Sequence, residues 1–296
     1  MTDPLRIALI GCGTHSRAHH AIPLCTYARE HPDEVVLAAA CDLEAEQAEI
    51  FRSEYGFRKP YTDVTEMLRD EELDACVSVM PVRHVVAMAE KLLRQGMPCV
   101  IEKPLGTSLE EARRLARVAE ETGTPHMVSV NRRFNPYLHR AVALVREEGR
   151  RLSLVRATML RHRRAEPNFA WATGIHAVDT LRHIGGEIES RSIGVASRGG
   201  LSNPWYHVDF VFESGCLGRL DILPTAGHHE ETYELFGEGM HCRVAIEGQS
   251  PSTLMVWRDG DLATELRSPE DEPYAVRVGA YDETAAFIRA LRSGER

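Results

Sequence analysis

The most informative segment of the chain for its fold is Ile7-Ala8-Leu9-Ile10-Gly11-Cys12-Gly13-Thr14-His15-Ser16. Its first four residues are apolar, as in a strand buried on both faces, and a turn of the form G-x-G-x-x-S follows directly. Gly11 permits a tight turn, Gly13 lets the backbone approach a pyrophosphate, and Ser16 is small enough for a helix to pack close to the strand. The N-terminus of that helix offers free N–H groups to phosphate oxygens. The segment therefore predicts the first β-α unit of a dinucleotide-binding domain.

Short apolar runs and amphipathic segments alternate along the first half of the chain. The clearest helix is Leu109–Glu121, where Ser108 and Glu111 form a capping box and Gly123 ends the helix. A β-α series of this kind requires a parallel sheet with right-handed crossovers. Residues 1–128 are thus predicted to form a Rossmann domain with a doubly wound parallel sheet. Its buried strands are predicted at Leu5–Ile10, Val35–Cys41, Ala75–Met80, Pro98–Ile101 and His126–Val130.

In the second half, strand-like segments are separated by hairpin signals such as Ser214-Gly215, Gly237-Glu238-Gly239 and Asp259-Gly260. Residues 129–296 are predicted to form an α+β domain with a large, mostly antiparallel open sheet, so the chain as a whole belongs to the α/β class. The strands are expected at Arg151–His162, Ser190–Ser197, Tyr206–Glu213, Gly218–Leu223, Tyr233–Phe236, Arg243–Ile246 and Leu254–Trp257, and the helices at Pro136–Glu148, Phe169–Ile184 and Tyr281–Arg292.

An acidic residue follows the second buried strand, in Ala40-Cys41-Asp42. A carboxylate at this position hydrogen-bonds the adenosine ribose hydroxyls of a bound dinucleotide and repels a 2′-phosphate. The sequence therefore favours NAD over NADP as cofactor. The alternative interpretation is that Asp42 only caps a helix.

A lysine follows the fifth strand, in Glu102-Lys103-Pro104. Pro104 keeps Lys103 out of helical geometry, at the carboxyl end of the sheet where open α/β folds bind ligands. An ammonium fixed there could hold a substrate hydroxyl or carbonyl beside the nicotinamide. The plainer alternative is a surface lysine at a strand end.

Taken together, these motifs and several others resemble the Gfo/Idh/MocA family of sugar and inositol dehydrogenases, in the order that the family has them and over nearly the whole chain. The resemblance implies an NAD(P)-dependent oxidoreductase that moves hydride between the nicotinamide and a secondary alcohol of a sugar, polyol or sugar derivative. The matching motifs are Gly11-Cys12-Gly13 with His19 downstream, Ala40-Cys41-Asp42, Met80-Pro81, Glu102-Lys103-Pro104-Leu105, Asn131-Arg132-Arg133-Phe134-Asn135-Pro136 and Gly174-Ile175-His176-Ala177-Val178-Asp179.

The resemblance also assigns roles to individual residues. It implies that Lys103 and His176 are catalytic, Lys103 binding the reacting hydroxyl and His176 contacting or deprotonating it. It places Asn131, Arg132, Thr173 and His176 against the substrate. The expected cofactor-binding residues are Gly11, Cys12, Gly13, Thr14, His15, Asp42, Met80, Pro81, His84, Glu102 and Lys103.

One position departs from the family pattern. The family usually has an aspartate four residues before the histidine, and here that position is Ala172, which can neither accept a proton nor orient an imidazole. Three interpretations stay open. The chain could be a dehydrogenase that relies on Lys103 and His176, helped by Asp179, His162 or a substrate group. It could retain the cofactor for a redox-neutral reaction on a sugar, or bind nucleotide without turnover.

Composition and charge exclude several classes of protein. The formal net charge of −9 argues against a nucleic-acid partner, which requires a basic face. No apolar run approaches the ~18–20 residues that span a bilayer, and Met1-Thr2-Asp3-Pro4 does not begin a signal peptide. The seven cysteines form no C-x-x-C pair, and Cys41, Cys76 and Cys99 lie in apolar runs, as reduced core residues do. We therefore expect a cytoplasmic protein, and the resemblance adds a homo-oligomer, a dimer or tetramer, formed through the C-terminal sheet.

Two groups of charged residues have both functional and ordinary interpretations. In Arg161-His162-Arg163-Arg164, Arg161 is a candidate for binding a substrate carboxylate or phosphate, although such runs are more often solvated loops. His176, Asp179 and His183 on one helix face, and His228-His229-Glu230, have residue types that can bind a metal, but a core position for the first group and an exposed position for the second are the favoured interpretations. No metal site is predicted.

Overall fold

A computed structural model describes residues 3–197, 200–247 and 251–294. The chain divides into two compact units: unit 1 holds the residues up to Ser129 together with those from Ala280, and unit 2 runs from Val130 to Gly279. The chain first passes from unit 1 to unit 2 after Ser129, within one residue of the expected boundary at 128/129. It returns to unit 1 at Ala280, and this return differs from the expectation that the second domain continues to residue 296.

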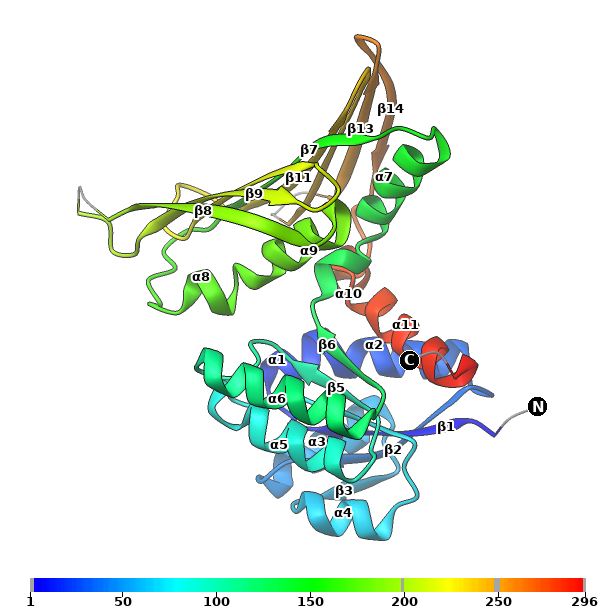
Figure 1. The fold of residues 1–296 in the computed structure, drawn as a ribbon. Helices are drawn as coiled ribbons and strands as arrows, with labels where there is room; N and C mark the ends of the chain where they lie inside the picture. Colours follow the sequence, from blue (N-terminus) through cyan, green and yellow to red (C-terminus); the bar gives the residue numbers. More distant parts are fainter. Residues whose placement is uncertain (1–2, 198–199, 248–250, 295–296) are drawn as a thin grey trace. The chain divides into compact units, whose positions relative to one another are not determined.

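Unit 1 contains a parallel sheet of six strands in the order β3-β2-β1-β4-β5-β6 (Figure 1). This is the order of a doubly wound Rossmann sheet, so that prediction is confirmed. The order reverses between β1 and β4, and ligands bind at the carboxyl ends of the strands beside such a reversal. The strands are β1 (Leu5–Ile10), β2 (Val35–Cys41), β3 (Lys59–Tyr61), β4 (Ala75–Ser78), β5 (Cys99–Glu102) and β6 (His126–Ser129).

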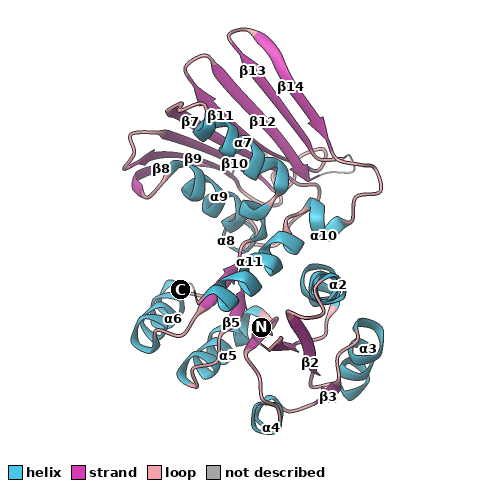
Figure 2. Ribbon diagram, turned by 90° about the vertical axis from the view of Figure 1, so that its right-hand side faces the viewer, coloured by secondary structure: helices cyan, strands magenta, loops and turns pink. Residues whose placement is uncertain are grey.

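Both faces of this sheet are covered by helices (Figure 2). In β1, Ile7 and Leu9 pack into one apolar core while Ala8 and Ile10 pack into another, because successive strand side chains point to opposite faces. The helices are α1 (Thr14–Ser16), a π-helix η1 (Arg17–Ala21), α2 (Ile22–Glu30), α3 (Ala45–Tyr55), α4 (Val64–Asp70), α5 (Val82–Arg94), α6 (Leu109–Thr122) and α11 (Ala280–Ser293).

Helix α11 explains why the chain returns to unit 1 at Ala280. Its apolar side carries Ala285, Phe287 and Ile288, and these side chains are buried in the core that also contains Leu24 of α2 and Ile7 of β1. Burying such a stripe is worth roughly 1.5–3 kcal/mol for each large apolar side chain. The helix predicted at Tyr281–Arg292 therefore exists, but it completes the nucleotide-binding unit and does not belong to the second.

Unit 2 is built around an eight-stranded sheet in the order β14-β13-β12-β11-β7-β10-β9-β8. Only β7 and β10 pair in parallel, so the sheet is mostly antiparallel, as predicted. The strands are β7 (Leu152–Leu160), β8 (Ile188–Ala196), β9 (Trp205–Phe212), β10 (Leu217–Leu223), β11 (Glu230–Gly237), β12 (Met240–Glu247), β13 (Thr253–Arg258) and β14 (Asp261–Arg267).

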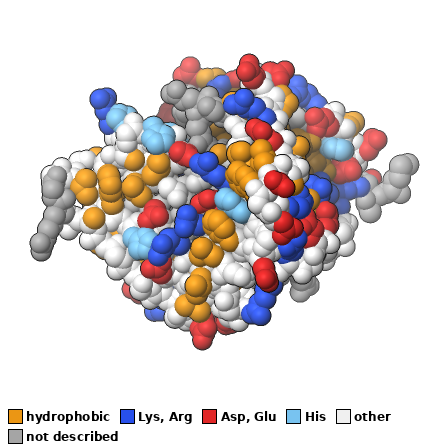
Figure 3. Space-filling model, turned by 90° about the horizontal axis from the view of Figure 1, so that it is seen from above, with side chains coloured by type: hydrophobic (Ala, Val, Ile, Leu, Met, Phe, Trp, Pro, Cys, Tyr) orange, Lys and Arg blue, Asp and Glu red, His pale blue; other side chains and the backbone are white. Residues whose placement is uncertain are grey.

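Helices cover only one face of this sheet. Leu138 of α7 and Leu181 of α9 pack into its apolar core. Exposed apolar side chains such as Val195, Leu217 and Leu262 lie on the strands, and Figure 3 shows apolar patches between charged side chains. The helical segments of unit 2 are η2 (Asn131–Phe134), α7 (Pro136–Glu147), α8 (Phe169–Ala172), α9 (Ile175–Gly185) and α10 (Tyr274–Arg277).

The helix predicted at Phe169–Ile184 is interrupted. It is divided into α8 and α9 at Thr173 and Gly174. A Cβ at Gly174 would lie 2.2 Å from the carbonyl oxygen of Ala170, so the close approach of the two turns requires glycine here. The break places His176 in the first turn of α9.

Two further expectations can be checked against the structure. None of the helices in the described ranges combines the length and the apolar character that crossing a bilayer requires. All seven cysteines are free thiols, and Cys41, Cys76 and Cys99 are buried core residues, as predicted.

Candidate active site

The glycine turn after β1 has the geometry that its sequence predicts. Gly11 has φ = +90°, and a Cβ there would lie 1.9 Å from the carbonyl oxygen of Val79, so no other residue fits. The Gly11 amide donates to Cys41 O at 2.8 Å, which ties the turn to β2. A Cβ on Gly13 would meet nothing within 4 Å, because the residue borders open space. The backbone amides at the start of α1 are thus accessible to an anion.

Asp42 is held in place by backbone amides. Its Oδ2 accepts from Cys12 N at 2.7 Å and its Oδ1 accepts from Glu44 N at 3.0 Å. The carboxylate therefore stands beside the glycine turn in a fixed orientation. Burial, together with the neighbouring Asp42, raises the pKa of the Cys12 thiol to about 12, so this thiol stays protonated. Cys12 supplies a backbone amide and lies beneath the turn.

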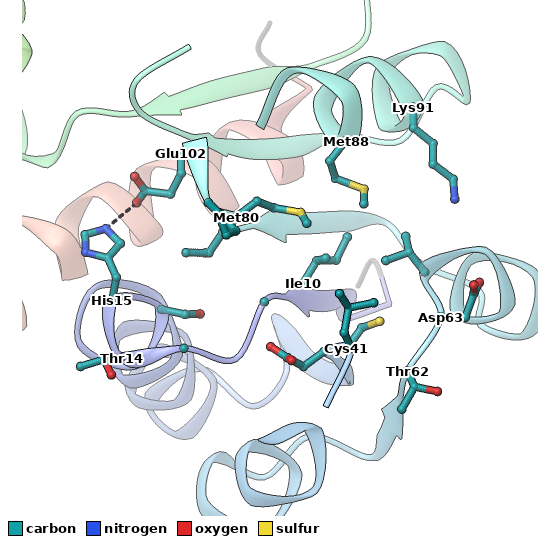
Figure 4. A pocket seen from close by; sticks show the side chains of 18 of the residues that line it. Ile10, Thr14, His15, Cys41, Thr62, Asp63, Met80, Met88, Lys91 and Glu102 are labelled. Atoms are coloured by element: carbon teal, nitrogen blue, oxygen red, sulfur yellow. Dashed lines mark hydrogen bonds and ion pairs between the residues drawn. The ribbon is translucent and has the colours of Figure 1, made fainter. Parts of the chain in front are cut away.

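A cavity of about 780 Å³ lies along this edge of the sheet in unit 1 (Figure 4). Asp42, after β2, and Lys103, after β5, both line it. Two expected cofactor-binding residues do not line it, because Cys12 is buried and His84 is exposed on α5 beside Arg83. The expected residues that do line it are Gly11, Gly13, Thr14, His15, Asp42, Met80, Pro81, Glu102 and Lys103.

One end of the cavity was missed by the sequence analysis. The loop between β3 and α4 contributes Thr62 and Asp63, and α5 contributes Met88 and Lys91. Lys91 Nζ donates to Thr65 Oγ1 at 2.8 Å. In the sequence, this part of the cavity could be indicated only by Asp63, a residue type that caps helices. Its carboxylate accepts from the amides of residues 65 and 66 and so caps α4.

The cavity wall fits a dinucleotide. Ser16 lines the cavity, is fully buried, and its hydroxyl has no hydrogen-bond partner among the described residues. A buried hydroxyl of this kind is costly unless a ligand satisfies it. Together with the open backbone at Gly13 and the fixed carboxylate of Asp42, it matches the pyrophosphate and ribose of NAD. These residues would hold the cofactor.

Lys103 follows β5 at the carboxyl edge of the sheet and lines the cavity. The Lys103–Pro104 peptide bond is cis. The neighbouring Glu102 is buried, with 3% of its surface exposed, and its Oε1 lies 3.1 Å from His15 Nε2 and 2.6 Å from His20 Nε2. Burial alone would raise the pKa of the Glu102 carboxyl, but the hydrogen bonds with His15 and His20 hold it well below its usual range.

The expected residues around His176 belong to unit 2. His176 is buried in the first turn of α9, directly after Thr173 and Gly174, and Ala172 ends α8. Asp179, one of the groups considered as a helper for His176, accepts two hydrogen bonds from the Arg133 guanidinium, from Nε at 2.8 Å and from Nη2. That pair gives Asp179 a role in joining η2 to α9.

Three of the expected substrate-binding residues, Asn131, Arg132 and Arg161, form hydrogen bonds with other residues of unit 2. Asn131 Nδ2 donates to Val278 O at 2.9 Å. Arg132 and Arg161 are both buried, and both donate to the fully buried carboxylate of Glu231. Arg161, the candidate for binding a substrate carboxylate or phosphate, thus has a carboxylate partner on β11.

The other charged groups considered from the sequence lie at the surface. Arg164 pairs with Glu166, and His162 contacts the carbonyl of Ala226. His228 pairs with Glu230 in an exposed position. The one cluster of potential metal ligands among the described residues is a different one, formed by His15, His20 and Glu102.

The chain is an α/β protein with a cavity at the switch point of a Rossmann sheet, where folds of this class bind dinucleotides. Residues 5–131 match the family described as "Oxidoreductase family, NAD-binding Rossmann fold" (GFO_IDH_MocA). That match, which spans the nucleotide-binding unit, agrees with the Gfo/Idh/MocA resemblance that the motifs indicated.

Relatives and solved structures extend the match over the whole chain. The chain is 27% identical to Inositol 2-dehydrogenase 2 of Saccharopolyspora erythraea, over 98% of this chain and 86% of that protein. Other curated relatives align over only 38% and 33% of their own length. Among solved structures, a dehydrogenase from Chromobacterium violaceum has a TM-score of 0.85 at 18% identity, covering 100% of this chain and 90% of that one. Levoglucosan dehydrogenase in complex with NADH has a TM-score of 0.79 at 19% identity, covering 99% and 91%.

Proposed function

We propose that the chain is an NAD-dependent dehydrogenase that transfers hydride between the nicotinamide and a secondary alcohol or ketone of a sugar, polyol or sugar derivative. The observation that supports this most is one cavity lined by Asp42, the glycine turn and Lys103 together. The names of similar proteins, an inositol dehydrogenase and a levoglucosan dehydrogenase, suggest the substrate class.

The bound cofactor supplies the hydride acceptor, and the protein supplies position and charge. The backbone from Gly11 to Thr14 and the Ser16 hydroxyl would hold the pyrophosphate, Asp42 would hold the adenosine ribose, and Met80 with Pro81 would pack on the cofactor; the cavity lining includes Gly11, Gly13, Thr14, Ser16, Asp42, Met80 and Pro81. Lys103 Nζ donates a hydrogen bond to the reacting oxygen and stabilises negative charge on it.

The proton balance of alcohol oxidation requires a base. As the carbinol C–H bond breaks, the hydroxyl proton passes to the His176 imidazole, and the reacting oxygen becomes the carbonyl oxygen of the product. Thr173, beside His176, is proposed to contact the substrate. Asn131, Arg132 and Arg161 remain candidates for the same role, with the structural partners described above competing for their polar groups.

Replacing Lys103 with Met tests the proposed chemistry. Removal of the ammonium should lower kcat by about 10²–10⁴-fold in a screen of polyols and sugars at alkaline pH. NADH affinity, measured by fluorescence titration, should change by less than about threefold, because the pyrophosphate and ribose contacts are intact. Lys91→Met, at the other end of the cavity, is the matched control and should retain kcat. Unchanged turnover in Lys103→Met would contradict the proposal.

Replacing Asp42 with Asn tests the cofactor preference. A charged hydrogen bond contributes about 1.5–3 kcal/mol, so NADH affinity should fall by roughly tenfold or more. NADPH affinity should fall less or rise, because the repulsion of a 2′-phosphate is removed. Glu44→Gln, which keeps the backbone amide that Asp42 accepts from, is the control. Equal affinity of the unchanged protein for both cofactors would refute the NAD preference.

Ala172 favours one alternative, a protein that binds nucleotide without turnover. The family's usual aspartate is replaced here by a methyl group four residues before His176. NADH binding without turnover of any substrate, unaffected by Ala172→Asp, would support this alternative. Turnover that rises in Ala172→Asp would support the dehydrogenase. Conversion of a sugar without net change in NADH would identify a redox-neutral reaction instead.

We also propose that the open face of the sheet in unit 2 pairs with a second copy of the chain. Its strands expose several apolar side chains, among them Val211, Leu217 and Leu262, on the face opposite the core that α7 and α9 cover. Light scattering after size-exclusion chromatography should give the mass of a dimer or tetramer. Leu217→Glu should shift it toward the monomer.

A further inference from the structure

The first helical segment of unit 1 changes its winding between two histidines. Residues Arg17–Ala21 form a π-helix, in which the Ile22 amide donates to the Arg17 carbonyl five residues earlier. In a regular α-helix, side chains five residues apart are about 140° apart around the axis. The wider turn brings His15 and His20 to the same buried carboxylate. Inserted π turns are frequent at functional sites.

Three potential ligand atoms converge at this point. His15 Nε2, His20 Nε2 and a Glu102 carboxylate oxygen all lie within 4.8 Å of one another. His20 and Glu102 are each 3% exposed, whereas the side chain of His15 is 47% exposed and lines the cavity (Figure 4). The group is therefore buried on one side and open to the cavity on the other.

We infer that His15, His20 and Glu102 bind a divalent transition-metal ion of the Zn²⁺ type at the wall of the cofactor cavity. Two imidazoles and one carboxylate form a donor set that zinc accepts, with a fourth position left for water or a ligand. Metal–ligand bonds of about 2.0–2.2 Å put neighbouring donor atoms roughly 3–3.5 Å apart. The contact between His15 and Glu102 already has that length, and the shorter contact between His20 and Glu102 would open by less than about 1 Å as the ion replaces the shared proton.

Neighbouring groups keep the three proposed metal ligands in the orientation and ionisation state that metal binding requires. The ring of His19 stacks on that of His15, with centroids 4.5 Å apart, which fixes the orientation of the more exposed ligand. The depressed pKa of the Glu102 carboxyl keeps it ionised at neutral pH, as a metal ligand must be. This cluster is distinct from both histidine groups considered from the sequence, which led to the expectation of no metal site.

A cation here would have a defined effect on the cavity. His15 is the residue after Thr14, at the helix start that receives the pyrophosphate in the proposed function. Added positive charge at that end should strengthen dinucleotide binding. The ion therefore regulates or supports cofactor binding, and the inference goes beyond the proposed dehydrogenase activity.

Metal titration of the full-length protein tests the site. Protein freed of metal with a chelator is titrated with Zn²⁺ by calorimetry and with Co²⁺ by absorption spectroscopy. We expect one ion per chain, a Co²⁺ spectrum without thiolate charge-transfer bands, and a rise in Tm with Zn²⁺. His15→Gln should weaken Zn²⁺ binding more than about 100-fold, since even the loss of a partner that only orients a ligand costs 10–100-fold.

Matched variants make the result decisive. His228→Gln removes an exposed histidine that pairs with Glu230, and Cys25→Ser removes a partly exposed thiol; both should bind Zn²⁺ as the unchanged protein does. His15→Gln decides the outcome even where the buried variant His20→Gln fails to fold, because the His15 ring is half exposed. No binding, unchanged binding in His15→Gln, or a thiolate band lost in Cys25→Ser would overturn the inference. NADH titration of the metal-free protein is separate, so failure of the metal site leaves the proposed function standing.

Discussion

Each unit of the molecule contains a buried cluster built around one glutamate, Glu102 in unit 1 and Glu231 in unit 2, and the two clusters differ in the partners of that carboxylate. Glu102 in unit 1 contacts two imidazoles, those of His15 and His20. Glu231 in unit 2 accepts from two guanidinium groups, those of Arg132 and Arg161, and from a tyrosine hydroxyl. Both carboxylates are almost fully buried, so each depends on its partners to offset the loss of hydration.

The difference in partners determines what each cluster can do. A guanidinium remains charged at every accessible pH, so the Glu231 cluster has one state and serves to hold β11, β7 and η2 together. Imidazole is a metal ligand, so the Glu102 cluster has the donor atoms to take up an ion. The Glu102 cluster also borders the cavity, whereas the Glu231 cluster uses two arginines that the sequence assigned to the substrate.

The largest effect is expected from Glu231→Gln. Removing one member of a buried ionic group costs about 3–5 kcal/mol, because the remaining charges are left without compensation. The free energy of unfolding, measured with urea, should fall by that amount. Glu187→Gln, which breaks an exposed pair with Arg182, should change it by less than about 1 kcal/mol. Similar losses of unfolding free energy in Glu231→Gln and Glu187→Gln would show that the buried Glu231 cluster stabilises the protein no more than an exposed ion pair does.

Glu102→Gln should give a smaller loss that depends on pH. At neutral pH we expect about 1–3 kcal/mol, from the buried charged hydrogen bonds. The folded-state pKa of Glu102 lies below its usual value, so its contribution is complete above the ordinary pKa of glutamate and is lost as pH falls through the folded-state value. The difference between the unchanged protein and Glu102→Gln should therefore narrow toward acid pH. A difference independent of pH would contradict the depressed pKa.

The smallest effect is expected from Tyr233→Phe. Its hydroxyl donates to Glu231 Oε1 at 2.7 Å, and burial keeps the pKa of the hydroxyl well above its ordinary value, so it remains a donor. One buried hydrogen bond contributes about 1 kcal/mol. Urea unfolding should show that loss, with turnover unchanged. A fall in turnover as large as that in Lys103→Met would instead place the Glu231 cluster at the site of the reaction.

The fold was predictable wherever burial governs the sequence. The first two strands, Leu5–Ile10 and Val35–Cys41, are apolar because both faces of the sheet are covered, and their predicted bounds are exact. Lys59–Tyr61 was missed because it is short and mostly exposed. Asp261–Arg267 was missed because an exposed edge strand carries no apolar alternation, although the turn before it was identified.

The site was predictable only in its local parts. Gly11, Asp42 and Lys103 act through their position at strand ends, which the sequence shows directly. The contacts of Arg161 with Glu231 and of His20 with Glu102 join residues 70 and 82 positions apart. The contact of His20 with Glu102 also requires a π turn, which no local sequence pattern predicted. Sequence periodicity carries no information on such pairs.

The return of α11 to unit 1 has a consequence for biosynthesis. A ribosome makes the chain from its N-terminus, and domains usually fold as they emerge. Here Phe287 and Ile288, which fill the first core, are made after all of unit 2. The nucleotide-binding unit therefore cannot close until unit 2 has been made, and until then Leu24 and its neighbours present an uncovered apolar surface that chaperones would shield.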